Sequence, residues 1–174
     1  MSDIAKIAVL VSGGGTNLQA LIDAQASGII KSGHIELVVS NKEGAYALCR
    51  AEKAGIKTSV LLRKNYGGAA EYEDALCKVI DGAGIDIIVL AGFMSILSVD
   101  FTSRYKDRII NIHPSLIPAF CGAGYYGLKV HKAALEYGAK VSGCTVHFVN
   151  EIPDGGAIIA QTAVAVKEDD TPEN

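Results

Sequence analysis

The hydrophobic positions fall into short continuous runs, separated by segments in which apolar residues recur at helical spacing. Runs of Val, Ile and Leu are typical of strands covered on both faces. The predicted strands are residues 6–12, 35–40, 57–62, 85–92 and 108–113, and the predicted helices between them are 16–26, 45–54, 69–81 and about 98–105. This alternation indicates right-handed crossovers and a doubly wound, mostly parallel α/β sheet.

The pattern changes after residue 113. A glycine-rich loop leads to a predicted helix at about 128–137, and two strand-like runs follow at 140–149 and 157–166. The seven residues that join these runs, NEIPDGG (150–156), are too few for a helical crossover, so we expect the two strands to pair antiparallel. No internal repeat or linker interrupts the chain. The sequence therefore predicts one α/β domain over residues 1–174 with antiparallel C-terminal strands.

Composition and charge exclude several classes of protein. The chain has 174 residues, of which 49% are hydrophobic, a formal net charge of −3 and no Trp. Without a Lys/Arg block or stacking aromatics, we expect no nucleic-acid partner. No run approaches the ~18 apolar residues of a membrane span, and the first run reads as a strand rather than a signal peptide. The four cysteines lack C-x-x-C spacing, which favours reduced thiols and a cytoplasmic location.

The first candidate for chemistry is SGGGTNL (12–18), between the first strand and the first helix. Glycines allow backbone N–H groups to approach an anion, and a helix N-terminus favours negative charge. The loop is not of the Walker A type, and it is a poor dinucleotide motif because Leu18 holds the third glycine's place and the second strand ends in Ser40-Asn41. A phosphomonoester fits better. The alternative is a tight turn with Thr16 as the helix cap.

The second candidate is IINIHPSLIP (109–118). Side chains at i and i+2 of a strand point the same way, so Asn111 and His113 project together while Ile112 faces the other side. Pro114 fixes how the chain leaves the strand. An amide beside an imidazole at a rigid strand end suits the stabilisation of an oxyanion. The alternative is a histidine that caps neighbouring backbone and an asparagine that ends a strand.

Asp154, followed by two glycines, is the third candidate. It could be a turn residue, or it could place a carboxylate beside His113 and favour the protonated, donor form of that imidazole. A Cys–His nucleophile is not expected, because Cys144 and His147 are three apart in a strand and leave opposite faces. The four histidines show no pair at metal-ligand spacing, so no metal is expected. The apolar segment LAGFMSILS (90–98) could wall a flat apolar ligand.

Together these motifs resemble the folate-dependent glycinamide ribonucleotide (phosphoribosylglycinamide) formyltransferases. The resemblance covers nearly the whole chain through SGGGTNLQAL, VLAGFMSILS, NIHPSLIP and GCTVHFVNEIPDGG. The last segment follows the family signature with Gly143, Thr145, Asp154 and Gly156. The resemblance implies a Rossmann-like formyltransferase fold. It also implies a cytoplasmic enzyme of de novo purine biosynthesis that moves a formyl group from 10-formyltetrahydrofolate to the amine of 5-phosphoribosylglycinamide.

The resemblance also implies the site residues. The substrate amine would attack the formyl carbon directly, so no enzyme nucleophile and no metal would be needed. The implied catalytic residues are Asn111, His113 and Asp154, supported by His147 and Pro114. The implied phosphate ligands are Gly14, Gly15, Thr16 and Asn17. The implied folate contacts are Leu90, Met94, Ser95, Ile96, Leu97, Asn111, Asn150, Glu151, Ile152, Pro153 and Asp154.

Three departures from the family accompany the resemblance. Ser95 and Ala69 stand where some members carry arginine, and FCGAGYYGLKVH is longer than in some relatives. The chain ends at Asn174, where the family usually continues into another helix, so we expect exposed last strands and low activity. The alternatives are a truncated, non-catalytic phosphate- or nucleotide-binding protein, or another 10-formyltetrahydrofolate enzyme such as a deformylase. The expected partners are the two small-molecule substrates, with the protein a monomer or a homodimer.

Overall fold

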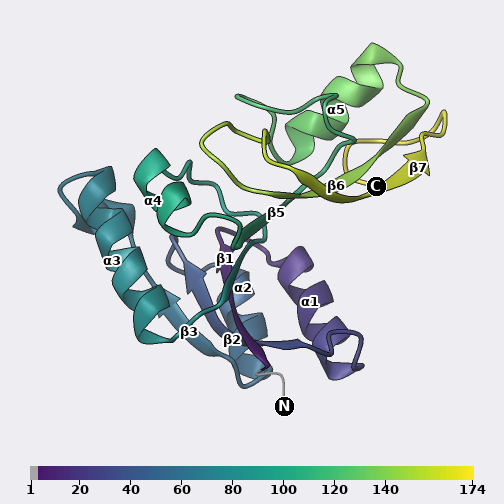
Figure 1. The fold of residues 1–174 in the computed structure, drawn as a ribbon. Coiled ribbons are helices and arrows are strands. Elements are labelled where there is room, and N and C mark those ends of the chain that lie inside the picture. The colour runs from purple at the N-terminus through teal and green to yellow at the C-terminus, as the bar shows by residue number, and fades with distance from the viewer. Residues whose placement is uncertain (1–3) are drawn as a thin grey trace. The chain divides into compact units, whose positions relative to one another are not determined.

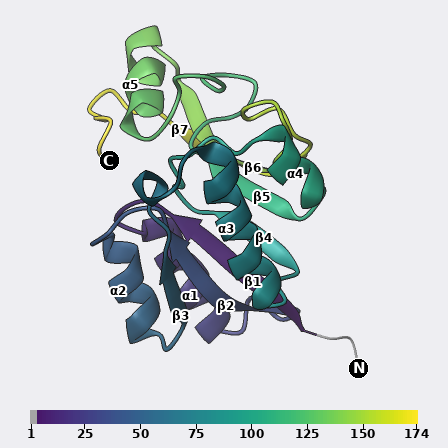
Figure 2. The same cartoon turned by 90° about the vertical axis from the view of Figure 1, so that its left-hand side faces the viewer.

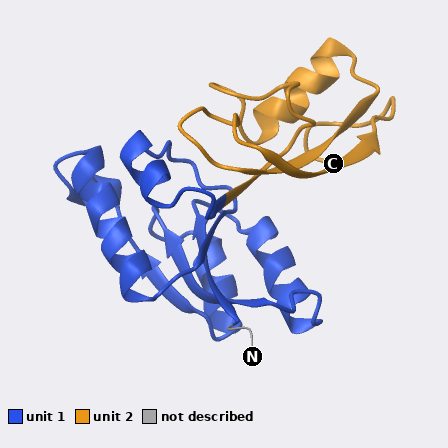
Figure 3. Cartoon of the chain, viewed as in Figure 1, with its two compact units in different colours: residues 1–109 blue, residues 110–174 orange. Residues whose placement is uncertain are grey.

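A computed structural model describes residues 4–174 of the chain. Its contacts divide the chain into two compact units, residues 1–109 and residues 110–174 (Figure 3). Each unit is described by itself below, and the single domain expected from the sequence stays a prediction.

Unit 1 holds parallel strands flanked by helices (Figure 1). The strands are β1 (Ala5–Val11), β2 (Gly33–Ser40), β3 (Lys57–Val60) and β4 (Ile87–Leu90), hydrogen-bonded in the order β3-β2-β1-β4. The helices are α1 (Thr16–Ala26), α2 (Tyr46–Lys53), the short 3-10 helix η1 (Arg63–Asn65), α3 (Ala69–Gly82) and α4 (Val99–Arg104). The β1 strand pairs with both β2 and β4 in parallel, as expected for a central strand of a doubly wound sheet.

The core of unit 1 is built on β1, whose residues from Ala8 to Val11 are all buried. On one face, Leu18 and Ile22 of α1 and Leu48 of α2 join Val9 and Val11 in a buried cluster. The long helix α3 covers the other face of the strands (Figures 1 and 2). Both faces of the parallel strands are thus removed from water, which explains their continuous hydrophobic character.

Unit 2 contains antiparallel strands and one helix. Strand β5 (Ile109–His113) begins at the residue where the units meet, and α5 (Leu128–Tyr137), β6 (Val141–Phe148) and β7 (Ile158–Ala165) follow. Strand β6 pairs antiparallel with β5 on one side and with β7 on the other. Every residue of β7 is exposed, as expected for the last strand, and the apolar Ile158, Ile159 and Val164 are among them.

The fold class predicted from the sequence is confirmed. The hydrogen-bonded strand order is β3-β2-β1-β4-β5-β6-β7, mostly parallel with antiparallel strands at the C-terminal end. The strand predicted at 85–92 is shorter because the Asp86 carboxylate accepts the Lys6 N–H, 2.8 Å away, and because Gly92 turns the chain with a φ of 71°. The strand predicted at 57–62 ends at Val60, and η1 was not predicted. Within residues 4–174, no helix is both long and apolar enough to cross a membrane.

Candidate active site

The glycine loop, residues 12–17, connects β1 to α1 in unit 1. Gly13, Gly14, Thr16 and Asn17 are exposed. Helix α1 begins at Thr16, its cap residue is Gly15, and in the described part of the chain no side chain caps it. Thr16 is therefore not the helix cap, contrary to the alternative considered from the sequence. The first N–H groups of α1 are free of side-chain acceptors, and no acidic residue lies in the first turn, so an anion can bind here.

Gly15 shows why this loop needs glycine. Its φ is 73°, a left-handed conformation that side chains disfavour. A Cβ at this position would lie 2.6 Å from the Cβ of Ala47, a residue of α2. The Ala47 N–H also donates to the Gly13 carbonyl over 3.1 Å. The second helix therefore packs directly against the loop and holds its backbone in place.

A cavity of about 500 Å³ lies in unit 1 beside the segment that follows β4. Four of the predicted folate contacts line it, together with residues from η1, α3 and the start of α4: Arg63, Ala69, Glu73, Met94, Ser95, Ile96, Leu97 and Ser98. Hydrogen bonds hold the segment in place: the Met94 N–H donates to Ser12 Oγ (2.7 Å), the Asn41 amide donates to Ser95 Oγ (2.8 Å), and the Ser98 N–H donates to Glu73 Oε1 (2.8 Å).

The apolar side chains of this segment divide between cavity and core. Met94 and Ile96 are 54% and 79% exposed, whereas Leu97 is buried. Leu90 is also buried, at the end of β4, and is not among the lining residues of the cavity. The exposed pair thus offers apolar surface to a ligand, with Leu97 and Leu90 contributing mainly to packing.

The polar cluster consists of Asn111, His113, His147 and Asp154, all in unit 2. Asn111 and His113 lie on β5, and the antiparallel register places His147 of β6 opposite Asn111. The Asn111 Nδ2 atom lies 3.1 Å from His147 Nε2. The Asp154 carboxylate reaches both rings, with Oδ2 3.4 Å from His113 Nδ1 and Oδ1 3.6 Å from His147 Nε2. The structure therefore brings together the residues predicted from the strand end and from the NEIPDGG turn.

The ring of His113 is buried, with 4% exposed, and acceptors face both its nitrogens. Nε2 lies 2.9 Å from the carbonyl of Phe120, which can only accept, so Nε2 carries a proton. Nδ1 faces the Asp154 carboxylate. In the protonated ring, both N–H groups have an acceptor, which is the arrangement expected of a residue that supplies positive charge.

The ring of His147 is also buried, and its tautomer follows from its neighbours. Nδ1 donates to the carbonyl of Phe148 over 2.8 Å. In the neutral ring Nε2 is then an acceptor and takes one N–H of the Asn111 amide, whereas in the protonated ring Nε2–H faces Asp154 Oδ1, 3.6 Å away. The bond from Asn111 to the neutral ring fixes which way the amide faces and leaves its second N–H available to a ligand.

Two opposing effects act on the pKa of the Asp154 carboxyl. Burial by itself raises it, but hydrogen bonds from His147 and from the Gly122 N–H (2.9 Å), and the charges of His113 and His147, outweigh burial and hold the pKa below its usual value. The carboxylate is therefore ionised at neutral pH. It can hold a positive charge on either neighbouring imidazole.

The signature residues around Asp154 support the loop that carries it. A Cβ on Gly156 would lie 1.7 Å from the carbonyl oxygen of Phe148, so only glycine fits. Thr145 Oγ1 donates to the Ser115 carbonyl (2.7 Å) and accepts the Ile117 N–H (3.0 Å), which joins β6 to the chain after β5. The predicted loop contacts from Glu151 to Pro153 are exposed, and Asn150 Oδ1 accepts the Ile152 N–H over 3.0 Å.

Backbone groups complete the cluster in ways that the sequence did not predict. The Phe120 carbonyl and the Gly122 N–H both come from the glycine-rich loop after β5, and Phe120 has a positive φ of 49°. The glycines signal a turn there but do not identify its partners. Across residues 4–174, no group of three or more His, Cys, Asp or Glu is placed to hold a metal ion. His147 is engaged by Asn111, Asp154 and Phe148 rather than by Cys144.

The chain thus combines an α/β fold with a glycine loop after β1 and a cluster of Asn111, His113, His147 and Asp154. The family model of the formyl transferases matches residues 5–174. The chain therefore belongs to the formyl transferase family.

Individual relatives agree with the family match. The chain is 48% identical over 168 residues to the phosphoribosylglycinamide formyltransferase of Haemophilus influenzae, covering 97% of this chain and 76% of that protein. It is 49% identical to the trifunctional purine biosynthetic protein adenosine-3 of Gallus gallus, covering 97% of this chain but only 16% of that protein. The crystal structure of glycinamide ribonucleotide transformylase 1 from Symbiobacterium toebii matches with a TM-score of 0.91 and 41% identity, covering 98% of this chain and 77% of that one.

Proposed function

We propose that this chain transfers the formyl group of 10-formyltetrahydrofolate to the amine of 5-phosphoribosylglycinamide, a step of de novo purine biosynthesis. The family match and the names of the relatives support this reaction. The observation that carries it is the polar cluster, in which the half-buried carboxylate of Asp154 contacts two imidazoles and the Asn111 amide contacts one of them. The reaction takes place in the cytoplasm, uses no metal and involves the two small molecules as its only partners.

In the proposed chemistry, the substrate amine attacks the formyl carbon, and the carbonyl oxygen becomes an oxyanion. The free N–H of Asn111 and the protonated His113 stabilise this charge. The bond from the formyl carbon to N10 of the folate then breaks. The proton lost by the attacking nitrogen is delivered to N10, with the ionised Asp154 directing its movement, and the oxyanion collapses to the new formamide.

This role requires His113 to exchange one contact. Its Nε2–H donates to the Phe120 carbonyl in the ligand-free structure, while Nδ1 faces Asp154. Asp154 is needed to balance the positive charge of the ring, so His113 keeps that contact. The formyl oxygen therefore replaces the Phe120 carbonyl as the acceptor of the Nε2–H bond. Gly124 and Gly127, which are exposed in the same loop, allow that segment to move.

The proposed binding residues are those predicted from the sequence. The substrate phosphate binds the glycine loop at Gly14, Gly15, Thr16 and Asn17. The folate binds Met94, Ser95, Ile96 and Leu97, which line the cavity of unit 1, and Leu90, with Asn111 and the loop from Asn150 to Asp154 as further contacts. Apolar surface beside a few polar groups suits a flat heteroaromatic ring.

The experiment is a release assay. Purified protein is mixed with 10-formyltetrahydrofolate, and tetrahydrofolate is followed with and without 5-phosphoribosylglycinamide. We expect release that depends on the nucleotide, disappears in His113→Ala and persists in His131→Ala, which removes a histidine on α5 outside the polar cluster.

Other outcomes identify the alternatives. Release without the nucleotide would indicate a deformylase. No release from protein that still binds the nucleotide would indicate a non-catalytic binding protein and contradict the proposal.

A further inference from the structure

Two carbonyl groups of the glycine loop, those of Gly13 and Gly14, bond to α2. The Gly13 carbonyl accepts the Ala47 N–H at 3.1 Å, and the Gly14 carbonyl accepts Nε–H of Arg50 at 2.9 Å. Both peptide bonds are trans, so each N–H points away from the carbonyl that precedes it. The N–H groups of Gly14 and Gly15 therefore point away from α2, on the side where the loop is exposed.

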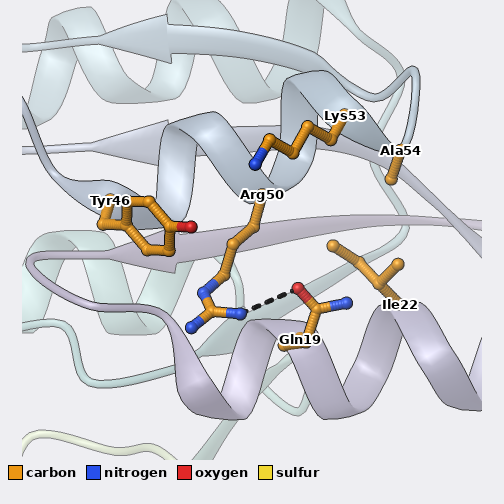
Figure 4. A pocket seen from close by; sticks show the side chains of 6 residues that line it. All are labelled: Gln19, Ile22, Tyr46, Arg50, Lys53 and Ala54. Atoms are coloured by element: carbon orange, nitrogen blue, oxygen red, sulfur yellow. Dashed lines mark hydrogen bonds between the residues drawn. The ribbon is translucent and has the colours of Figure 1, made fainter.

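Arg50 joins this loop to α1. Its Nη1 donates to Oε1 of Gln19 over 3.0 Å (Figure 4). The Gln19 backbone N–H in turn donates to the Gly15 carbonyl over 2.9 Å. The Tyr46 ring lies against the guanidinium, 4.9 Å from its carbon to the ring centroid. The guanidinium of Arg50 therefore has two donors in hydrogen bonds and one face against an aromatic ring, which restricts its orientation. Arg50 thus holds both the Gly14–Gly15 peptide and helix α1, whose N-terminus follows the loop.

We propose that Arg50 is a positioning residue for the phosphate site. It does not contact the phosphate, and it acts by orienting the Gly14–Gly15 peptide so that the Gly15 N–H donates to the phosphate oxygen. Its positive charge on the Gly14 carbonyl also polarises that peptide and strengthens the N–H as a donor. This inference rests on the proposed function, which assigns the loop to the substrate phosphate.

The same surface offers a matched control. Arg50 and Lys53 line one hollow of about 390 Å³ together with Gln19, Ile22, Tyr46 and Ala54 (Figure 4). Both cations lie on α2, but among the described residues Lys53 makes no hydrogen bond to the loop. A long-range charge effect on phosphate would be shared by both residues. An effect through the Gly14 carbonyl belongs to Arg50 alone.

The test is a set of binding titrations on the full chain. Kd is measured for 5-phosphoribosylglycinamide and for the corresponding riboside without phosphate, in the wild type, Arg50→Ala, Arg50→Lys and Lys53→Ala. We expect Arg50→Ala to weaken binding of the phosphorylated ligand about tenfold, the loss of one charge-assisted contact, and to leave the riboside unchanged. Arg50→Lys should recover part of the loss, and Lys53→Ala should match the wild type.

The outcomes separate this inference from the proposed function. Equal losses for both ligands in Arg50→Ala, or a loss of the same size in Lys53→Ala, would overturn the positioning role. An unchanged preference for phosphate in Arg50→Ala would overturn it as well. A wild type that does not distinguish the two ligands would instead overturn the phosphate site itself, and the inference with it. Urea unfolding of each variant checks that the fold is intact.

Discussion

The glycine loop and the polar cluster are built to hold charge by different means. The loop offers backbone N–H groups, and the residues proposed to bind phosphate there carry no charged side chain. The polar cluster offers side chains that are themselves titratable: His113, His147 and Asp154, with the Asn111 amide. Gly13, Gly14, Thr16 and Asn17 of the loop are exposed, whereas both imidazoles of the cluster are buried.

This difference predicts how each region responds to change. A backbone site keeps its donors at any pH and loses them only when the chain changes conformation. A buried side-chain site depends on the protonation and presence of each member, because a missing partner leaves a buried charge or dipole unpaired. Single substitutions in the cluster should therefore affect turnover, and substitutions in the loop should affect backbone geometry and phosphate affinity.

The largest effect is expected from His113→Ala. The change removes the proposed oxyanion donor and leaves Asp154 with one imidazole fewer, and we expect kcat to fall roughly 10³-fold. Single-turnover formyl transfer measures this fall. His131→Ala is the control on α5 and should retain wild-type kcat. A fall of less than tenfold in His113→Ala would show that the cluster does not carry the chemistry.

Asp154→Asn should lower kcat about 10²-fold, because the amide keeps the shape of the side chain but cannot hold the charge of the imidazole.

The same variant tests the pH behaviour of the cluster. The pKa of Asp154 is lowered in the folded protein, so its ionised form stabilises the fold above the unfolded-state pKa, near pH 4, and this contribution is lost as pH falls through the folded pKa. The free energy of unfolding should therefore fall more steeply below about pH 4 in the wild type than in Asp154→Asn. Urea unfolding at a series of pH values gives both slopes. Parallel slopes would contradict the ion pairing.

Gly15→Ala is the corresponding change in the loop. It places a Cβ in a left-handed residue and against Ala47, and we expect a loss of about 2 kcal/mol in the free energy of unfolding together with weaker phosphate binding. Gly28→Ala is the matched control, because Gly28 has a φ of 74° and open space around a Cβ. Only the conformational cost, about 1 kcal/mol, is expected there. Equal losses would mean that contact with α2 is unimportant.

The fold was predictable to the extent that it follows from local periodicity. Helix 16–26 and helix 128–137 begin and end where the sequence pattern predicts, because apolar spacing and a terminal glycine act within a few residues. Strand ends were less predictable, since Asp86 and Gly92 shorten β4 through a side-chain bond and a turn rather than through hydrophobicity.

The candidate site, too, was predictable from the sequence only in part. The strand period correctly placed Asn111 and His113 in one cluster, and the short NEIPDGG turn allowed Asp154 to join them. The contacts of Arg50 with Gly14 and of His113 with Phe120 were not predictable. In both, the partner is a backbone carbonyl, which every residue possesses, and for Arg50 it lies 36 residues away. Such contacts leave no signature in residue type or spacing.

The smallest effect is expected from Thr16→Ala, which tests whether the loop relies on backbone alone. If the Thr16 side chain capped α1, its removal would cost about 1 kcal/mol. Because the cap is Gly15 and Thr16 is exposed, we expect a change below about 0.5 kcal/mol in urea unfolding.

Ser98→Ala provides the contrast, because Ser98 Oγ accepts the Phe101 N–H at the start of α4 and donates to the carboxylate of the buried Glu73. We expect that variant to lose about 1–2 kcal/mol. A loss of that size in Thr16→Ala would mean that a side chain already satisfies the first turn of α1. An anion would then have to displace it, and the distinction between a backbone site and a side-chain site would fail at this residue.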